Sequence, residues 1–166
     1  MIAGRHGHCS LFTYNMRTVR YLEIGRDLQE RFPGKTLCAP EIGGLGWTFK
    51  GNILDAIAWV SPEALKYHPL NVPQELAMKG IAAIPPRLII DFLPDLVVSM
   101  RLFSQGFRKA LRRPGFPPYH LIRRYAIYAD PRWRLFYDRY VEVYQLGTTP
   151  SSTSLSAAPA ENVPLR

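Results

Sequence analysis

A glycine-dense segment over residues 36–63, TLCAPEIGGLGWTFKGNILDAIAWVSPE, most constrains what this chain can fold into. Apolar runs of strand length, 37–39 and 53–59, lie on either side of four glycines. Because glycine tolerates tight turns and close backbone approach, the segment predicts two neighbouring strands joined by a glycine turn. Glu41 and Asp55 are then expected to lie at the ends of these strands, beside the same turn.

Apolar periodicity along the rest of the chain predicts the elements around this pair of strands. Helices are predicted over 18–32, 62–67, 86–93 and 103–111. Strands are predicted over 36–41, 53–59, 96–99, 119–128 and 136–146. Pro33-Gly34 is expected to end the first helix, Ser61 to cap the second, and Asp130-Pro131 to form a hairpin turn. This order predicts an α/β fold whose mixed sheet is parallel in its centre and antiparallel in an edge hairpin, with helices packed on it.

Length and composition predict one domain with tails. A chain of 166 residues, 47% of them hydrophobic, is long enough for one core and too short for two. We expect a flexible segment at 1–16, an α/β domain at 17–147 and a disordered tail rich in Ser, Thr, Pro and Ala at 148–166. The most hydrophobic stretch, 80–103, is interrupted by prolines and charges, so it lacks the ~20 continuous apolar residues of a membrane span.

Positive charge is concentrated in one part of the chain. The window 101–134 contains nine basic residues and one acid, whereas the remaining residues carry twelve of each sign. Such a patch attracts the phosphates of nucleic acid, anionic lipid headgroups or a lipid-linked sugar phosphate. The residues predicted to contact a membrane or phosphate are Arg108, Lys109, Arg112, Arg113, Arg123 and Arg124.

The succession PEIGxLGW, ILD, VSPEAL and PDLVVS resembles the C-terminal extracytoplasmic domain of bacterial membrane glycosyltransferases of the GT-C type. Those enzymes are related to protein mannosyltransferases and take sugars from polyprenyl-phosphate carriers. The resemblance covers about 17–146. Its strongest residues are Glu41, Ile42, Gly43, Leu45, Gly46, Asp55, Ser61, Pro62, Glu63, Pro94 and Asp95. Ala58 and Trp59 stand where such domains usually carry glycine and leucine.

The resemblance implies an accessory domain that shapes a cleft for a sugar donor or acceptor and is not catalytic by itself, with no cofactor and no metal. Its implied partners are a transmembrane portion missing from this chain and an anionic lipid or polyprenyl-phosphate sugar. The implied location is the extracytoplasmic face of the bacterial inner membrane when the domain is joined to that portion, and the cytoplasm when it is expressed alone. The predicted cleft residues are Glu41, Gly43, Gly46, Trp47, Asp55, Tyr67 and His68, with the loop up to residue 86.

The residues also leave other functions open. The basic window, interleaved with tyrosines and phenylalanines, fits a free-standing nucleic-acid-binding protein. Glu41 and Asp55 fit a small hydrolase if they form an acid–base pair. In purely structural roles, Glu41 would accept N–H groups of the glycine turn, and Asp55 would hold a loop or pair with an arginine. Asp95 is expected to fix the junction between a helix and a strand.

Two cysteines permit at most one disulfide. Cys38 lies in an apolar run, so a buried thiol is the simpler expectation than a bridge to Cys9. The spacing of His6, His8 and Cys9 matches no standard pair of zinc ligands.

Overall fold

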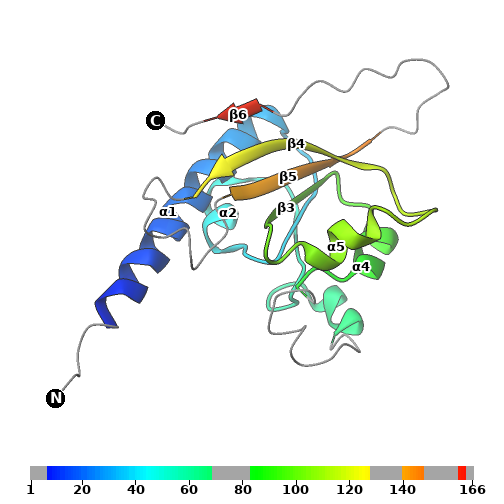
Figure 1. The fold of residues 1–166 in the computed structure, drawn as a ribbon, viewed down its shortest axis with the longest axis horizontal. Helices are drawn as coiled ribbons and strands as arrows, with labels where there is room; N and C mark the ends of the chain where they lie inside the picture. The colour runs from blue at the N-terminus through cyan, green and yellow to red at the C-terminus, as the bar shows by residue number, and fades with distance from the viewer. Residues whose placement is uncertain (1–6, 69–82, 128–139, 148–160, 164–166) are drawn as a thin grey trace.

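The fold was obtained as a computed structural model that describes residues 7–68, 83–127, 140–147 and 161–163 (Figure 1). Side chains are described throughout these ranges except in 7–16 and 161–163. The predicted loop at 69–82 and the predicted hairpin turn at 130–131 lie outside the described residues. Within the described part of the chain, no helix has the length and apolar character needed to cross a bilayer.

One mixed sheet organises the molecule, in the strand order β2-β1-β3-β5-β4-β6. The parallel centre is made of β1 (Leu37–Ala39), β2 (Ile53–Asp55) and β3 (Leu96–Met100). Strand β5 (Tyr140–Leu146) runs antiparallel to β3, and β4 (Tyr119–Ala126) runs antiparallel to β5. These pairings confirm the predicted fold class. A short strand, β6 (Glu161–Val163), pairs in parallel with β4 and lies within the segment 148–166.

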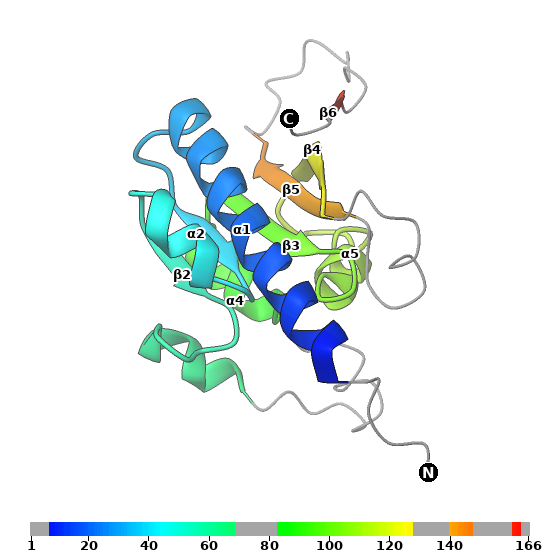
Figure 2. The same ribbon diagram turned by 90° about the vertical axis from the view of Figure 1, so that its left-hand side faces the viewer.

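Helices cover both faces of the sheet (Figure 2). Helices α1 (Gly7–Arg31) and α2 (Gly43–Thr48) bury Ile24, Leu28 and Leu45 on one face. The other face is covered by the 3-10 helix η1 (Pro62–Tyr67), α4 (Pro86–Phe92) and α5 (Gln105–Ala110). Successive residues of a strand point to opposite faces, so along β3 Leu96 and Val98 belong to the first core and Val97 to the second.

Helix α1 is longer than the sequence predicted, since it begins at Gly7 rather than near residue 18. Its predicted end is found close to the expected place, because the helix stops at Arg31 and Gly34 then adopts a left-handed φ of 72°. The chain reverses there and enters β1. The middle of α1, at Arg17, Thr18 and Tyr21, lies beside the segment that follows β1, and Figure 2 shows the helix running across one face of the sheet.

The predicted glycine turn between β1 and β2 is wrong in form, because residues 43–48 form helix α2. Among the described glycines, positive φ occurs at Gly34 and Gly115 and not in this segment. Gly44 instead permits close helix packing, since a Cβ built there would lie 2.6 Å from the Cβ of Tyr21 and 2.7 Å from the carbonyl oxygen of Thr18. Small residues at this crossing let α2 lie directly against α1.

Two further sequence predictions can be compared with the fold. Strand β2 ends at Asp55 rather than at Trp59, because a turn begins at residue 56. Cys38 is a free thiol that is fully buried in the sheet, so the disulfide alternative is wrong.

Candidate functional site

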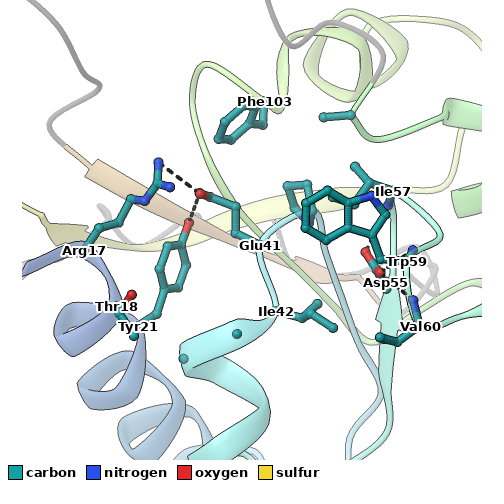
Figure 3. A pocket seen from close by; sticks show the side chains of 14 residues that line it. Arg17, Thr18, Tyr21, Glu41, Ile42, Asp55, Ile57, Trp59, Val60 and Phe103 are labelled. Atoms are coloured by element: carbon teal, nitrogen blue, oxygen red, sulfur yellow. Dashed lines mark hydrogen bonds and ion pairs between the residues drawn. The ribbon is translucent and has the colours of Figure 1, made fainter. Parts of the chain in front are cut away.

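A pocket of about 520 Å³ lies at the carboxyl ends of the parallel strands (Figure 3). The chain leaves β1 towards β2 on one side, whereas after β3 it leads to the antiparallel strands on the other. Connections that diverge in this way open a crevice beyond the strand ends, which is where open α/β sheets bind ligands. The walls come from Arg17, Thr18 and Tyr21 of α1, the segments 40–44 and 55–60, Ala83, and Phe103 after β3.

Glu41, two residues beyond β1, is the polar centre of one wall. It accepts a 2.7 Å hydrogen bond from the Tyr21 hydroxyl and forms a 3.1 Å ion pair with Arg17. Arg17 and Tyr21 are one helical turn apart, so α1 presents both to the same carboxylate. Burial raises the pKa of Glu41 above its ordinary value, although Arg17 and the Tyr21 hydroxyl oppose the increase. The expectation that Glu41 accepts N–H groups of the glycine turn is wrong, because within the described residues its carboxylate contacts Tyr21 and Arg17, both of α1.

Asp55, at the end of β2, is fully buried and organises the loop that follows it. Its Oδ1 accepts the Ile57 N–H at 3.1 Å, and its Oδ2 accepts the N–H groups of Trp59 and Val60 at 2.7 and 3.0 Å. Asp55 thus holds a loop, as one of its two expected structural roles requires. We call these hydrogen bonds the Asp55 clamp.

Ser61 completes the loop in a way that the sequence did not predict. Its hydroxyl accepts the backbone N–H of Asp55 at 2.9 Å and makes no capping hydrogen bond to η1. Ala58, inside the loop, has a φ of 66°, the left-handed region in which glycine is favoured. This is the position where the resembled domains usually carry glycine.

Trp59 lies on the wall of the pocket although 85% of its surface is exposed. Trp47, the tryptophan predicted for the cleft, is 74% exposed but lies on α2 outside the pocket lining. Of these two tryptophans, the structure therefore brings Trp59 and not Trp47 to this pocket. The available signal was the position of Trp59 in a short loop after a buried aspartate, where the backbone N–H groups need an acceptor.

The other predicted cleft residues divide between the pocket and its surroundings. Gly43 lines the pocket, whereas Gly46 is an exposed residue of α2. Tyr67 donates a 2.8 Å hydrogen bond to Asp91, and His68 Nε2 lies 2.8 Å from the Ala56 carbonyl oxygen. Tyr67 thus joins η1 to α4, and His68 contacts the loop that follows Asp55. The segment 69–82, also predicted to shape the cleft, lies outside the described residues.

Sequence reasoning missed Arg17, Tyr21 and Phe103 as pocket residues. Only the position of α1 over the strand ends, and of the turn after β3, brings them to Glu41.

The six predicted phosphate contacts divide into two groups. Arg108 and Arg124 lie 3.8 and 3.3 Å from Glu142, a carboxylate with only 2% exposure, and Arg123 lies 3.9 Å from Asp27. These three guanidinium groups are engaged with acids of the fold, the buried Glu142 and the partly exposed Asp27. The exposed side chains, for which no ion pair is found in the described part of the chain, are Lys109, Arg112 and Arg113; we call them the basic ridge.

Comparison of the chain with protein-family models, with curated proteins and with solved structures gave no match.

Proposed function

We propose that this chain is a non-catalytic accessory domain of a membrane glycosyltransferase, in which it shapes the cleft for a sugar donor or acceptor at the extracytoplasmic membrane surface. One observation carries the proposal. Glu41 and Asp55, which belong to different motifs of the resemblance, line the same pocket, and Ser61 of a third motif binds Asp55 from behind. Asp55 and Ser61, which lie 14 and 20 residues after Glu41 in the sequence, therefore contribute to the same site as Glu41.

The chemistry of the pocket supports a carbohydrate as its ligand. A sugar ring has apolar C–H faces and hydrogen-bonding edges, so it is recognised by an aromatic face together with charged hydrogen-bonding groups. The pocket combines the exposed indole of Trp59 with the carboxylate of Glu41 and apolar side chains including Ile57 and Phe103. Apolar walls with a few placed polar groups are typical of small-molecule sites.

Binding is better supported than acid–base catalysis. Both oxygens of Asp55 accept backbone N–H groups and are therefore engaged in holding the loop. Glu41 has a partner at each oxygen, Arg17 at Oε1 and Tyr21 at Oε2. A hydrolase that used these two carboxyls as a general acid and a general base would need both of them to exchange protons during the reaction.

The basic ridge supports a location beside an anionic membrane. Lys109, Arg112 and Arg113 follow one another closely at the end of α5 and are all exposed. A basic residue near an anionic lipid surface contributes about 1 kcal/mol to binding. The ridge would then face lipid headgroups or the phosphate of a polyprenyl carrier.

Sedimentation with vesicles at low salt tests the proposal. We expect binding to vesicles that contain phosphatidylglycerol and a polyprenyl phosphate, and a loss of about tenfold or more when Arg112 and Arg113 are both replaced by serine. The control variant replaces Arg26 and Lys50, two exposed basic residues away from the ridge, by serine. Absence of vesicle binding, or equal effects of the two variants, would contradict the membrane-facing role. Preferential binding of an oligonucleotide would favour the nucleic-acid alternative instead.

A further inference from the structure

We infer that the pocket binds one uncharged pyranose ring between Trp59 and Glu41, and that the Asp55 clamp positions Trp59 as its stacking platform. This inference rests on the proposed function and specifies the ligand class and the residue roles. Figure 3 shows the indole of Trp59 on one side of the pocket and the Glu41 carboxylate on the other. A flat ring placed between them meets an apolar face and a hydrogen-bonding edge at once.

The backbone that carries Trp59 is fixed, even though its indole is exposed. Asp55 accepts the N–H groups of Trp59 and of the next residue, Val60, so the peptide groups on both sides of the Trp59 Cα are held. The preceding Ala58 is held in left-handed backbone geometry, which is unfavourable for alanine and therefore depends on such restraints. An aromatic side chain on a restrained loop loses little further conformational freedom when a ligand stacks on it.

Glu41 retains hydrogen-bonding capacity after its internal contacts are counted. A carboxylate accepts about four hydrogen bonds, two at each oxygen. Tyr21 and Arg17 each engage one oxygen, which leaves acceptor positions for the hydroxyl groups of a sugar. The same two contacts fix the orientation of the carboxylate. Hydrogen bonds to an ionised group are stronger than neutral ones, so Glu41 supplies directional recognition at the edge of the ring.

The charges of the pocket select an uncharged ring. Two carboxylates, Glu41 and Asp55, line the pocket with one guanidinium, Arg17, which is paired with Glu41. A phosphate or uronate placed inside would meet an excess of negative charge in a partly dry site, where like charges repel strongly. The phosphate of a lipid carrier would therefore remain outside the pocket. A volume of about 520 Å³ lies in the lower part of the range of small-ligand pockets, so it suits a single sugar ring with its substituents rather than a long glycan.

The test measures binding of methyl pyranosides of glucose, mannose, galactose and N-acetylglucosamine to the full chain, by calorimetry and by tryptophan fluorescence. We expect at least one of these uncharged glycosides to bind with millimolar affinity or better, and glucuronate and glucose 6-phosphate to bind about tenfold more weakly or not at all. Equal or tighter binding of the charged sugars would overturn the inference. Absence of saturable binding by all four glycosides would also overturn it.

Surface variants assign the platform without a risk to folding. Trp59→Ala is expected to weaken glycoside binding about tenfold, whereas Trp59→Phe retains most of the affinity because it keeps an aromatic face. Trp47→Ala, a matched loss of an exposed indole outside the pocket, should leave affinity unchanged. Equal effects at the two tryptophans would contradict the platform role.

The clamp is tested by a spectroscopic readout as well as by affinity. Asp55→Asn keeps one carbonyl oxygen as an acceptor but loses the charge, so we expect weaker glycoside binding and lower fluorescence anisotropy of Trp59. Ala58→Gly keeps the clamp and should keep the affinity. A folded Asp55→Asn variant with unchanged anisotropy and affinity would contradict the role of Asp55 in positioning Trp59. If Asp55→Asn does not fold, the Trp59 variants test the stacking platform.

The two proposals fail in different ways. Vesicle binding without glycoside binding refutes this inference alone, and glycoside binding without vesicle binding refutes only the membrane-facing role.

Discussion

The Tyr21 hydroxyl donates a 2.7 Å hydrogen bond to the Glu41 carboxylate and so joins helix α1 to the segment that follows β1. Tyr21 is only 3% exposed, and its ring belongs to the core under α1. One side chain therefore connects the packing of the domain to the polar wall of the pocket. Changes at this contact should affect both stability and ligand binding.

Replacing Tyr21 by phenylalanine removes the hydroxyl and keeps the ring. We expect the free energy of unfolding to fall by about 1–2 kcal/mol, because a hydrogen bond to a partly buried carboxylate is lost while Arg17 still pairs with Glu41. Urea denaturation measures the change. Tyr140→Phe, at a position 37% exposed on β5, is the control and should have little effect. A loss no larger than that of the control would contradict the structural role of the hydroxyl.

Gly44→Ala tests the close packing of α2 against α1. The added Cβ would lie 2.6 Å from the Cβ of Tyr21, so α2 must move away, and we expect a loss of about 1–3 kcal/mol in unfolding free energy. The matched variant is Gly46→Ala in the same helix, where a Cβ meets no atom within 4 Å. That variant should gain up to ~1 kcal/mol from helix propensity. Thermal or urea denaturation of both proteins gives the comparison, and similar effects of the two would rule out a tight crossing.

The ionisation of Asp95 is expected to make the stability of the fold depend on pH. Its carboxylate accepts the Thr36 N–H at 2.8 Å and pairs with Lys35 at 2.9 Å, which ties the starts of β1 and β3 together. Burial alone would raise the pKa of Asp95, but the Lys35 ammonium and the Thr36 N–H outweigh it, so the pKa is lowered.

A carboxyl whose pKa is lower in the folded state stabilises the fold above the unfolded pKa of about 3.9, and this contribution is lost as the pH falls further. We therefore expect the melting temperature to fall between about pH 5 and pH 2, and Asp95→Asn to be less stable at neutral pH with a weaker dependence on acid. Asp27, whose pKa is also lowered, leaves part of the dependence in place. A variant as acid-sensitive as the parent would refute the role of Asp95.

The thiol of Cys38 is expected to be unreactive in the folded protein. The thiol is fully buried, and burial together with the negative charge of Asp55 raises its pKa far above the ordinary range. Because the thiolate is the reactive form, a disulfide reagent should react with Cys38 much more slowly in buffer than in denaturant. A Cys9→Ser background leaves Cys38 as the only cysteine of the chain. Fast reaction under native conditions would contradict the position of Cys38 in the sheet.

The sequence predicted the sheet well because its signals are local. Short apolar runs at 37–39, 53–59 and 96–99 predict the buried strands that the structure has at 37–39, 53–55 and 96–100, and the patterns of 119–128 and 136–146 predict the antiparallel pair β4 and β5. Such runs need no knowledge of how distant elements pack. Asp95 is different, because its carboxylate does not act within the junction around Pro94 but joins the start of β3 to Lys35 and Thr36 before β1.

The form of the pocket could not be predicted in the same way. Glycines at 43, 44 and 46 usually indicate a turn, and only the proximity of α1 explains why they form a helix. The partners of Glu41 are 20 and 24 residues earlier on α1, at positions that sequence spacing cannot align with a strand end. The choice between Trp47 and Trp59 depends on the loop that the Asp55 clamp holds, because this loop and not α2 brings a tryptophan to the pocket lining.

The most direct test of the account is a heteronuclear NMR titration of the full chain with an uncharged methyl pyranoside, in which the indole N–H signals are assigned by Trp→Phe variants. We predict saturable shifts of the Trp59 indole and of backbone signals at Tyr21 and Glu41, with the Trp47 indole unchanged. Shifts centred on Trp47 or on the basic ridge, with none at Trp59 and Glu41, would contradict the assignment of the pocket as a sugar site.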